Sequence, residues 1–390
     1  MYTLGRELSM ASPRRTTDPR SSTDPPSSPD RELGGPAMRR PGGPSNEQTN
    51  ARKAFYDDIA EQNLAPLWER IAGLVTRTPQ PTAQPVHWRY ATVRESLLTA
   101  GRLLTAEEAE RRVLIFENPG LAGRSQVTDS LFSGLQLLLP GERAHAHRHA
   151  ASALRLFLEG SGAYTAVDGE RTNMQRGDFV ITPSWTWHDH GNDGRDPVIW
   201  LDGLDVPMVN LFKASFSEGS DAKNASAGAP AGDCEARYGG ALLPDGCKAT
   251  SLSSPLLNYR YAEARDRLAA MLRNGPMDPC HGVKLRYANP LTGGSVMPTM
   301  SAAIQLLPAG FRTAPYRSTD GTVFVVVEGR GRSEIGDATF DWAENDVFVA
   351  PGWAPQQHQA RTEAVLFSFS DRAAQEKLGL WREQRGAYAG

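Results

Sequence analysis

The chain has 390 residues, with 45 acidic and 42 basic side chains, a formal net charge of −3, 37 glycines and 28 prolines. This length predicts about two domains, and the near-neutral charge argues against a nucleic-acid-binding protein, which needs a surplus of Lys and Arg to neutralise phosphates. The longest apolar runs, such as residues 323–327, are far shorter than a membrane-spanning helix. Three cysteines are too few for a disulfide framework, so we expect a cytoplasmic protein without a membrane segment.

Residues 1–47 are predicted to form a disordered tail. They contain eight prolines and a single aromatic residue, Tyr2, so they cannot bury enough apolar surface to offset the entropy of the chain. The stretch has no apolar core for a signal peptide, and its aspartates argue against a transit peptide. Met38 is an alternative to Met1 as the start of translation.

Residues 48–115 are predicted to form a helical N-terminal segment. Apolar side chains three and four residues apart flank Pro66, which predicts two short helices with a break between them. A second helical pair follows over 96–104 and 105–112. Thr105 and Glu108 form a capping box at the start of its second helix.

Short strands separated by Gly, Pro and Asp are predicted beyond residue 115. In the first part of this region they are 136–139, 154–158, 164–167, 179–181 and 198–201. Residues 217–250 are rich in Ser, Ala and Gly, so we expect 217–280 to be a linker that contains a helix.

An internal repeat organises the strand-rich region. Leu135 aligns with Ile304 at an offset of 169, and Asp178 aligns with Asp346 at an offset of 168. Trp185 recurs as Trp353, which favours a packing role for both rings. Two β modules, predicted at 116–216 and 281–390, therefore lie in tandem, and their short strands are typical of a jelly roll or small barrel.

A histidine cluster distinguishes the first module. His147 and His149 are two residues apart, so in a strand both point to the same face. His188, from a later strand, can complete a set of three imidazoles, a donor type that suits Fe, Zn, Cu and Ni. His145 lies two residues further out and is not expected to be a ligand.

Four sequence runs carry a resemblance to a known family. They are PGERAHAHRH (140–149), GDFVITPSWTWHDHGN (177–192), HGVKLRYANPLTGGS (281–295) and YRSTDGTVFVVVEGRGRSEIGD (316–337). In this order they resemble the gentisate 1,2-dioxygenase family over about residues 54–385. The resemblance implies a mainly β bicupin protein, with two tandem cupin domains of double-stranded β-helix type. It also implies a homo-oligomer, commonly a tetramer, and an enzyme that cleaves an aromatic 2-hydroxy acid with O₂.

The resemblance implies one Fe(II) per chain, held in the first module by His147, His149 and His188. Cupins usually have a Glu after the second His, separated from it by three or four residues. That Glu is absent here, because Ala153 and Leu154 stand at these positions. Three neutral imidazoles leave the charge of the ion uncompensated, which favours an anionic bidentate substrate.

The resemblance also implies the substrate contacts. Arg155 would pair with the substrate carboxylate, helped by Arg111 or Arg112, between which the sequence does not choose. His190 is the candidate acid or base, with Asp202 as its orienting partner. The remaining expected contacts are the polar Gln136 and the pocket walls Phe132, Gly134 and Trp187.

The second module lacks the histidine set. Tyr316, Ser318 and Gln356 align with the three histidines, and only His358 matches a first-module histidine, His190. We therefore expect the C-terminal cupin to be metal-free and to serve stability or subunit contacts.

Three functional classes follow. The leading one is a ring-cleaving dioxygenase that converts gentisate to maleylpyruvate, or a variant acting on salicylate or 1-hydroxy-2-naphthoate. The others are a cupin isomerase, whose site normally keeps the Glu that is absent here, and a cupin binding or storage protein, against which the intact histidine set argues.

Overall fold

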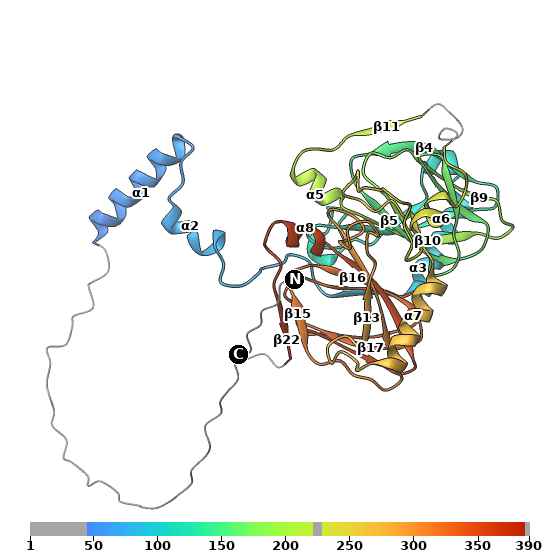
Figure 1. Cartoon of the computed structure of the whole chain (residues 1–390). Helices are drawn as coiled ribbons and strands as arrows, with labels where there is room; N and C mark the ends of the chain where they lie inside the picture. The colour runs from blue at the N-terminus through green and yellow to red at the C-terminus, as the bar shows by residue number, and fades with distance from the viewer. Residues whose placement is uncertain (1–44, 221–227, 387–390) are drawn as a thin grey trace, which may run out of the picture. The chain divides into compact units, whose positions relative to one another are not determined.

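The computed structural model describes residues 45–220 and 228–386 (Figure 1). The chain divides into two compact units, Met1–Leu74 and Val75–Gly390. Almost all of the predicted disordered tail lies outside the described residues. No helix within the described ranges has the length and apolar character needed to cross a membrane.

The first unit contains two helices, α1 (Asn46–Glu61) and α2 (Leu67–Leu74). The predicted break between two short helices is therefore confirmed. Ser45 caps α1 in a capping box with Gln48, so the helix begins at Asn46, one residue before the predicted end of the tail.

The second unit begins with short elements that join two barrels. They are β1 (Val86–Trp88), α3 (Tyr90–Leu103), α4 (Ala106–Ala109), β2 (Val113–Ile115) and the 3₁₀ turn η1 (Pro119–Leu121). The capping box predicted at Thr105 and Glu108 is present at the start of α4. The segment was expected to be helical, but β1 pairs with β19 of the C-terminal barrel and β2 pairs with β3 of the N-terminal barrel.

The N-terminal barrel is formed by two facing sheets, with strand orders β12-β8-β5-β10-β3-β2 and β11-β4-β9-β6-β7. Its elements are β3 (Phe132–Leu138), β4 (Arg143–His149), β5 (Ala153–Glu159), β6 (Ala163–Val167), β7 (Glu170–Asn173), β8 (Phe179–Thr182), β9 (His188–Asn192), β10 (Val198–Leu204), α5 (Val206–Leu211), β11 (Ser217–Gly219), α6 (Asp233–Tyr238) and β12 (Asn258–Tyr259). All five strands predicted in this module are confirmed.

The C-terminal barrel repeats this plan, with strand orders β1-β19-β16-β21-β14-β13 and β18-β17-β20-β15-β22. Its elements are α7 (Tyr261–Asn274), β13 (Val283–Arg286), β14 (Ser301–Leu307), β15 (Tyr316–Ser318), β16 (Thr322–Glu328), β17 (Gly331–Ile335), β18 (Ala338–Trp342), β19 (Val347–Ala350), β20 (Gln356–Ala360), β21 (Ala364–Ser370), α8 (Arg372–Lys377) and β22 (Glu383–Arg385). The predicted mainly β, two-barrel architecture is confirmed.

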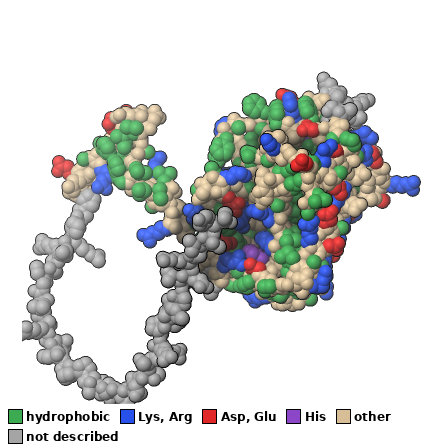
Figure 2. All heavy atoms as spheres, viewed as in Figure 1, with side chains coloured by type: hydrophobic (Ala, Val, Ile, Leu, Met, Phe, Trp, Pro, Cys, Tyr) green, Lys and Arg blue, Asp and Glu red, His purple; other side chains and the backbone are tan. Residues whose placement is uncertain are grey.

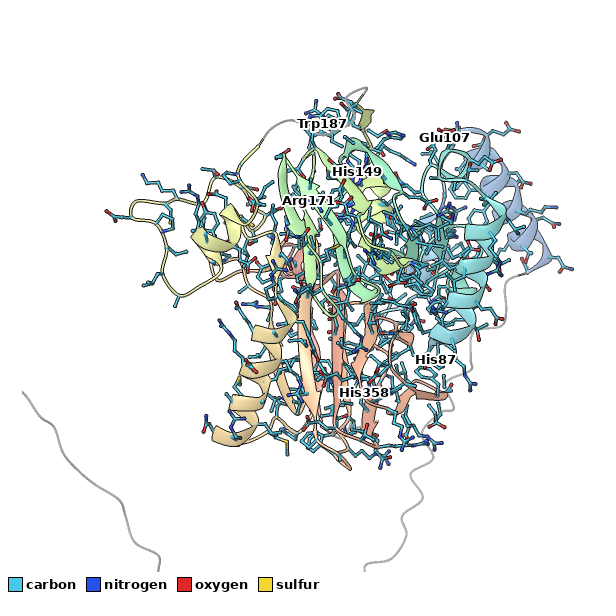
Figure 3. All side chains as sticks on the ribbon, turned by 90° about the vertical axis from the view of Figure 1, so that its right-hand side faces the viewer. His87, Glu107, His149, Arg171, Trp187 and His358 are labelled. Carbon is cyan, nitrogen blue, oxygen red and sulfur yellow. The ribbon has the colours of Figure 1, made fainter. Side chains whose placement is uncertain are left out.

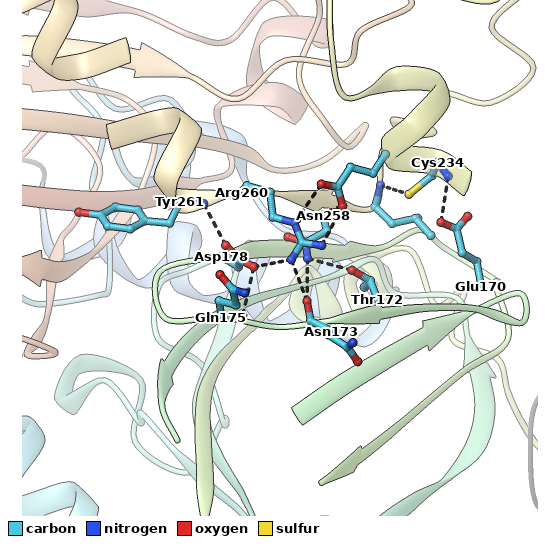
Figure 4. Close-up of polar contacts among 11 residues, drawn as sticks. Glu170, Thr172, Asn173, Gln175, Asp178, Cys234, Asn258, Arg260 and Tyr261 are labelled. Carbon is cyan, nitrogen blue, oxygen red and sulfur yellow. Dashed lines mark hydrogen bonds and ion pairs between the residues drawn. The ribbon is translucent and has the colours of Figure 1, made fainter. Parts of the chain in front are cut away.

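Part of the predicted linker is fixed to the N-terminal barrel (Figure 4). Arg260 forms ion pairs with Asp178 and Glu235, both at 2.8 Å. Asn258 donates a hydrogen bond to Thr172 Oγ1 at 2.9 Å. Residues 233–261 therefore pack as a strap on this barrel, although the composition around them predicted a linker.

The two six-stranded sheets contribute to one shared apolar core. Because neighbours along a strand point to opposite faces, Leu154 and Leu156 of β5 enter this core together with Val323 and Val325 of β16. Arg155, between the two leucines, points the other way, into the N-terminal barrel. The strand pattern that builds the shared core thus also aims a cation into the barrel interior.

The repeated tryptophans differ from the expected packing role. Trp185 and Trp353 both have a positive φ, 63° and 65°, and neither is fully buried. An arginine lies over each ring, Arg148 at 4.5 Å from the first centroid and Arg317 at 4.7 Å from the second. The repeat therefore extends to backbone conformation and to a cation–π contact.

Replacing Phe367 by alanine is expected to destabilise the second unit by about 3–5 kcal/mol. Phe367 is fully buried in the shared core and lies 5.3 Å from Phe179, centroid to centroid. Denaturant unfolding would measure the loss. Leu378→Ala, at a side chain that is 66% exposed, is the control and should change the free energy of unfolding by well under 1 kcal/mol. Similar effects of both changes would contradict the shared-core assignment.

Candidate metal and substrate site

Three histidines meet inside the N-terminal barrel. His147 and His149 lie on β4, and His188 lies on β9 directly opposite His147 in the strand register. One potential ligand atom from each residue lies within 4.8 Å of the others. Within the described ranges this is the one group of three such side chains found, and the C-terminal barrel has none.

Backbone carbonyls hold the three imidazoles. Nδ1 of His147 lies 3.0 Å from the carbonyl of His145, Nδ1 of His149 lies 2.7 Å from that of Ala151, and Nδ1 of His188 lies 2.9 Å from that of Thr186. A carbonyl only accepts, so each Nδ1 carries the proton and each Nε2 keeps its lone pair. Nε2 of His188 is buried without a hydrogen-bond partner. This arrangement suits a transition-metal ion.

Burial, together with the neighbouring positive charges, keeps the imidazoles neutral. Burial, with a contribution from Arg111, lowers the pKa of His147 to about 3. Burial and Arg155 lower the pKa of His188 still further, and the pKa of His149 is also lowered, chiefly by burial. Neutral imidazoles are the form that binds a metal ion at neutral pH.

A cavity of about 320 Å³ opens beside the histidines. It has the size of a small-ligand pocket, for which roughly 300 Å³ is the lower end. Of the expected site residues, its lining contains His147, His149, Arg111, Arg155, Gln136, Asp202 and Phe132. The strand register explains part of this set, because Asp202 pairs directly with Arg155.

Arg155 is almost completely buried and keeps its charge. One guanidinium nitrogen donates to Thr182 Oγ1 at 2.6 Å, and Nε lies 3.3 Å from Oδ1 of Asp202. Burial lowers the pKa of Arg155 to about 10, which still leaves it protonated at neutral pH. Burial raises the pKa of Asp202 to about 6 against the opposing effect of Arg155.

The structure distinguishes the two arginines between which the sequence did not choose. Arg112 forms an ion pair with Glu142 at 2.8 Å and donates to the carbonyl of Leu104 at 2.9 Å, away from the cavity. Arg111 lines the cavity. Both residues follow Glu110, whose φ of 47° ends helix α4.

His190 differs from its expected arrangement. Its Nδ1 lies 3.0 Å from Thr165 Oγ1, whereas Asp202 faces Arg155 and accepts a hydrogen bond from Trp200 Nε1 at 3.1 Å. The orienting partner of His190 is therefore Thr165, which the sequence did not indicate. His190 is buried behind His188, 5.6 Å from it between ring centroids, and it is outside the described cavity lining.

Gly134 and Trp187, the other two expected pocket walls, lie in different surroundings. A Cβ on Gly134 would lie 2.7 Å from the carbonyl oxygen of Leu114, so this glycine permits the close approach of β2. Trp187 lies under the guanidinium of Arg148, 4.8 Å from its ring centroid, near the outer end of the barrel (Figure 3). Neither residue belongs to the described lining of the cavity.

Other cavity residues come from segments without a periodic pattern. They are Arg124, Ser125, Gln126, Val206, Pro207 and Asn210. The loop before β3 and the short helix α5 supply them, and no motif in the sequence indicated either segment.

Comparison with known proteins agrees with this architecture. A family model described as a cupin domain matches residues 134–204. The fold and the three-histidine site thus define a tandem cupin protein, with one candidate metal centre among the residues that the structure describes.

Relatives with named activities indicate which family of tandem cupin proteins the chain belongs to. The chain is 55% identical over 337 residues to gentisate 1,2 dioxygenase 1 of Aquipseudomonas alcaligenes, covering 86% of this chain and 97% of that protein. It is 36% identical to 5-aminosalicylate 1,2-dioxygenase of Comamonas sp., covering 89% and 92%. The crystal structure of salicylate 1,2-dioxygenase from Pseudoaminobacter salicylatoxidans with gentisate superposes with a TM-score of 0.82 at 32% identity, covering 90% and 97%. The chain belongs to the gentisate 1,2-dioxygenase family of ring-cleaving dioxygenases.

Proposed function

We propose that the protein binds one Fe(II) through His147, His149 and His188 and uses O₂ to cleave gentisate to maleylpyruvate. The observation that carries the proposal is the set of three backbone-oriented imidazoles beside a cavity that contains two arginines. When bound, Fe(II) would supply open coordination positions and the redox chemistry of ring cleavage.

The protein's own groups select an anionic substrate. Three neutral histidines contribute no negative charge, and Arg155 and Arg111 add positive charge on one side of the cavity. A carboxylate accepts from a guanidinium in a planar two-point contact, which fixes its orientation as well as its position. The substrate carboxylate is therefore held toward these arginines, with its neighbouring hydroxyl toward the histidines.

Gln136 has an unused donor in this cavity. Its Nε2 is buried and has no hydrogen-bond partner, although the side chain is only 2% exposed. A buried donor without a partner is costly, and a substrate oxygen would satisfy it. We therefore assign Gln136 to substrate binding.

Gln136→Met is expected to weaken substrate binding by about tenfold while leaving stability almost unchanged. The substitution removes a donor to the substrate, worth about 1.4 kcal/mol, without breaking a described hydrogen bond of that amide nitrogen. Steady-state kinetics would show the change mainly in KM. Gln305→Met, at the equivalent position of the C-terminal barrel, is the matched control and should leave KM unchanged. An equal rise in KM for both variants would contradict the assignment.

Gentisate is favoured among the candidate substrates by the 55% identical relative, which carries that activity in its name. Salicylate is the second candidate, because the salicylate 1,2-dioxygenase matches over 90% of this chain. The two acids differ by one ring hydroxyl. A site that hydrogen-bonds this hydroxyl would discriminate strongly, whereas an apolar contact would not.

Oxygen uptake tests the proposal directly. The protein is loaded anaerobically with Fe(II), and a second sample is loaded with Zn(II). Gentisate, salicylate and 1-hydroxy-2-naphthoate are then compared under the same conditions. We expect O₂ consumption with Fe(II) alone and a kcat/KM for gentisate at least about tenfold above the others, a difference of about 1.4 kcal/mol. Turnover of none of the three acids would overturn the proposal.

Two further predictions belong to this proposal. A homotetramer is expected, and light scattering at several concentrations would measure the assembly.

A cytoplasmic location is expected. It is supported by three cysteines that are free in the structure, Cys234, Cys247 and Cys280.

A further inference from the structure

The C-terminal barrel contains a larger cavity than the histidine site. Its volume is about 670 Å³, and its lining includes Tyr316, Ser318 and Gln356, the residues aligned with the three histidines of the N-terminal barrel. The repeat has therefore preserved a hollow at the same place while replacing its metal-ligand chemistry. Figure 2 shows one face of the molecule, on which histidine surface lies among basic and acidic side chains.

Two buried amides in this cavity have unused hydrogen-bonding atoms. Nε2 of Gln305 and Oε1 of Gln356 have no hydrogen-bond partner, and the residues are 1% and 7% exposed. Buried polar atoms are nearly always paired in folded proteins, so two unpaired atoms facing one cavity require an explanation. Together they offer one donor and one acceptor to a ligand.

A cation lies beside the unused donor. Lys284 of β13 is the direct register partner of Gln305 on β14, and both line the cavity. Among the described residues no carboxylate forms an ion pair with Lys284. Burial lowers the pKa of Lys284 from its ordinary value, and Asp320 is the nearest opposing charge in effect. A carboxylate oxygen of Asp320 already accepts from Trp381 Nε1 at 2.8 Å, so a ligand carboxylate would add the negative charge that favours protonated Lys284.

The other charged groups of the lining are paired, neutral or on an exposed strand. Arg385 pairs with Asp278, Arg372 pairs with Glu376 at 2.8 Å, and Arg286 donates to a backbone carbonyl. The two histidines of the lining, His281 and His358, both have a pKa lowered mainly by burial, so they are neutral. Glu383 lies on the exposed strand β22.

The walls of the cavity suit an organic ligand rather than a bare inorganic anion. Phe324 stands where Arg155 stands in the N-terminal barrel, and Phe369 and Tyr316 add further aromatic surface. A volume of about 670 Å³ is that of a pocket for a small organic molecule, for which roughly 300 to 1,000 Å³ is usual.

We propose that the C-terminal barrel binds a small hydroxylated carboxylic acid at a site independent of the metal centre. Lys284 is the counter-ion of the carboxylate, Gln305 Nε2 donates to it, and Gln356 Oε1 accepts from the ligand hydroxyl. The binding requires no metal ion. It gives the second cupin a ligand-binding role in addition to stability or subunit contacts.

Crystals soaked anaerobically with 5-bromosalicylate test the proposal, because anomalous scattering from bromine locates each bound molecule. This probe carries a carboxylate and a hydroxyl, and the histidine site provides an internal reference. We expect one bromine position in each barrel of the wild-type protein. Calorimetry in solution should give two molecules per chain, which separates binding in solution from binding at crystal concentration only.

Lys284→Met is expected to remove the C-terminal bromine position and to reduce the calorimetric stoichiometry to one. Arg155→Met should have the opposite effect, weakening the N-terminal site and leaving the C-terminal one. Unchanged ring-cleavage kcat in Lys284→Met would show that the variant is folded. If that variant does not fold, Gln305→Leu replaces it and should weaken the C-terminal site by about tenfold. An empty C-terminal barrel in the wild type, or an undiminished site in the folded variant, would overturn the proposal.

Discussion

His188→Ala is expected to lose bound iron and ring-cleavage activity together. His188 is fully buried, it lies at the centre of the three-histidine group, and its Nε2 has no protein partner. Changes to outer-shell partners of metal ligands already cost about 10–100-fold in affinity or activity, so removal of a ligand should cost more than a hundredfold. Metal analysis after Fe(II) loading and desalting, with oxygen uptake on the same sample, measures both losses.

His145→Ala is the matched control for this prediction. His145 lies on the same strand but is exposed, and it contributes its backbone carbonyl rather than its ring to the site. The alanine variant keeps that carbonyl, so it should retain one iron per chain and full activity. Stoichiometric iron with turnover in His188→Ala, or equal iron loss in both variants, would contradict the ligand assignment. Far-ultraviolet circular dichroism would show that both proteins are folded.

His147 and His149 were predictable from local geometry, and His188 was predictable because its run, 177–192, resembles a motif of the family. Strand alternation puts His147 and His149 on one face, and a repeat that lacks them at the matching positions marks them as special to the first module. The tandem barrels were predictable for a similar reason, since short strands, turn residues and the repeat offset are all visible along the chain. Register was not needed for either inference.

The partners of the buried polar groups were not predictable, because they depend on how strands pair. Thr165 reaches His190 since β6 and β9 pair with these two residues directly opposite, and nothing local to either residue fixes that register. Asp202 was expected to be the orienting partner of His190, but the pairing of β10 with β5 places it opposite Arg155. Cross-strand registers follow from the whole fold.

The choice between Arg111 and Arg112 depended on a single turn. Had α4 continued through residue 112, as the sequence predicted, the two side chains would have kept helical spacing. The positive φ of Glu110 ends the helix and separates the directions of the two arginine side chains.

The strap formed by residues 233–261 was not predicted, because its composition resembles that of a linker. Specific ion pairs, which the composition does not reveal, hold it in place.

Arg155→Met should lower kcat/KM by roughly a hundredfold or more, because it removes a charged donor to the substrate carboxylate, worth about 1.5–3 kcal/mol for each hydrogen bond. The same change also leaves Asp202 buried without its ion-pair partner, which costs about 3–5 kcal/mol of stability. A loss of activity alone would therefore not distinguish substrate binding from a structural role.

The double variant Arg155→Met/Asp202→Asn separates these two roles. It removes both charges, so the uncompensated carboxylate disappears and most of the lost stability should return. The substrate would still lack its cationic partner, so kcat/KM should stay low and KM should stay high. Recovery of kinetics together with stability would show that Arg155 acts only on the fold. If stability is restored but substrate affinity stays low, the charge of Arg155 acts on the substrate carboxylate. Arg111→Met, at the partly open side of the cavity, should also lower substrate affinity, by a smaller factor.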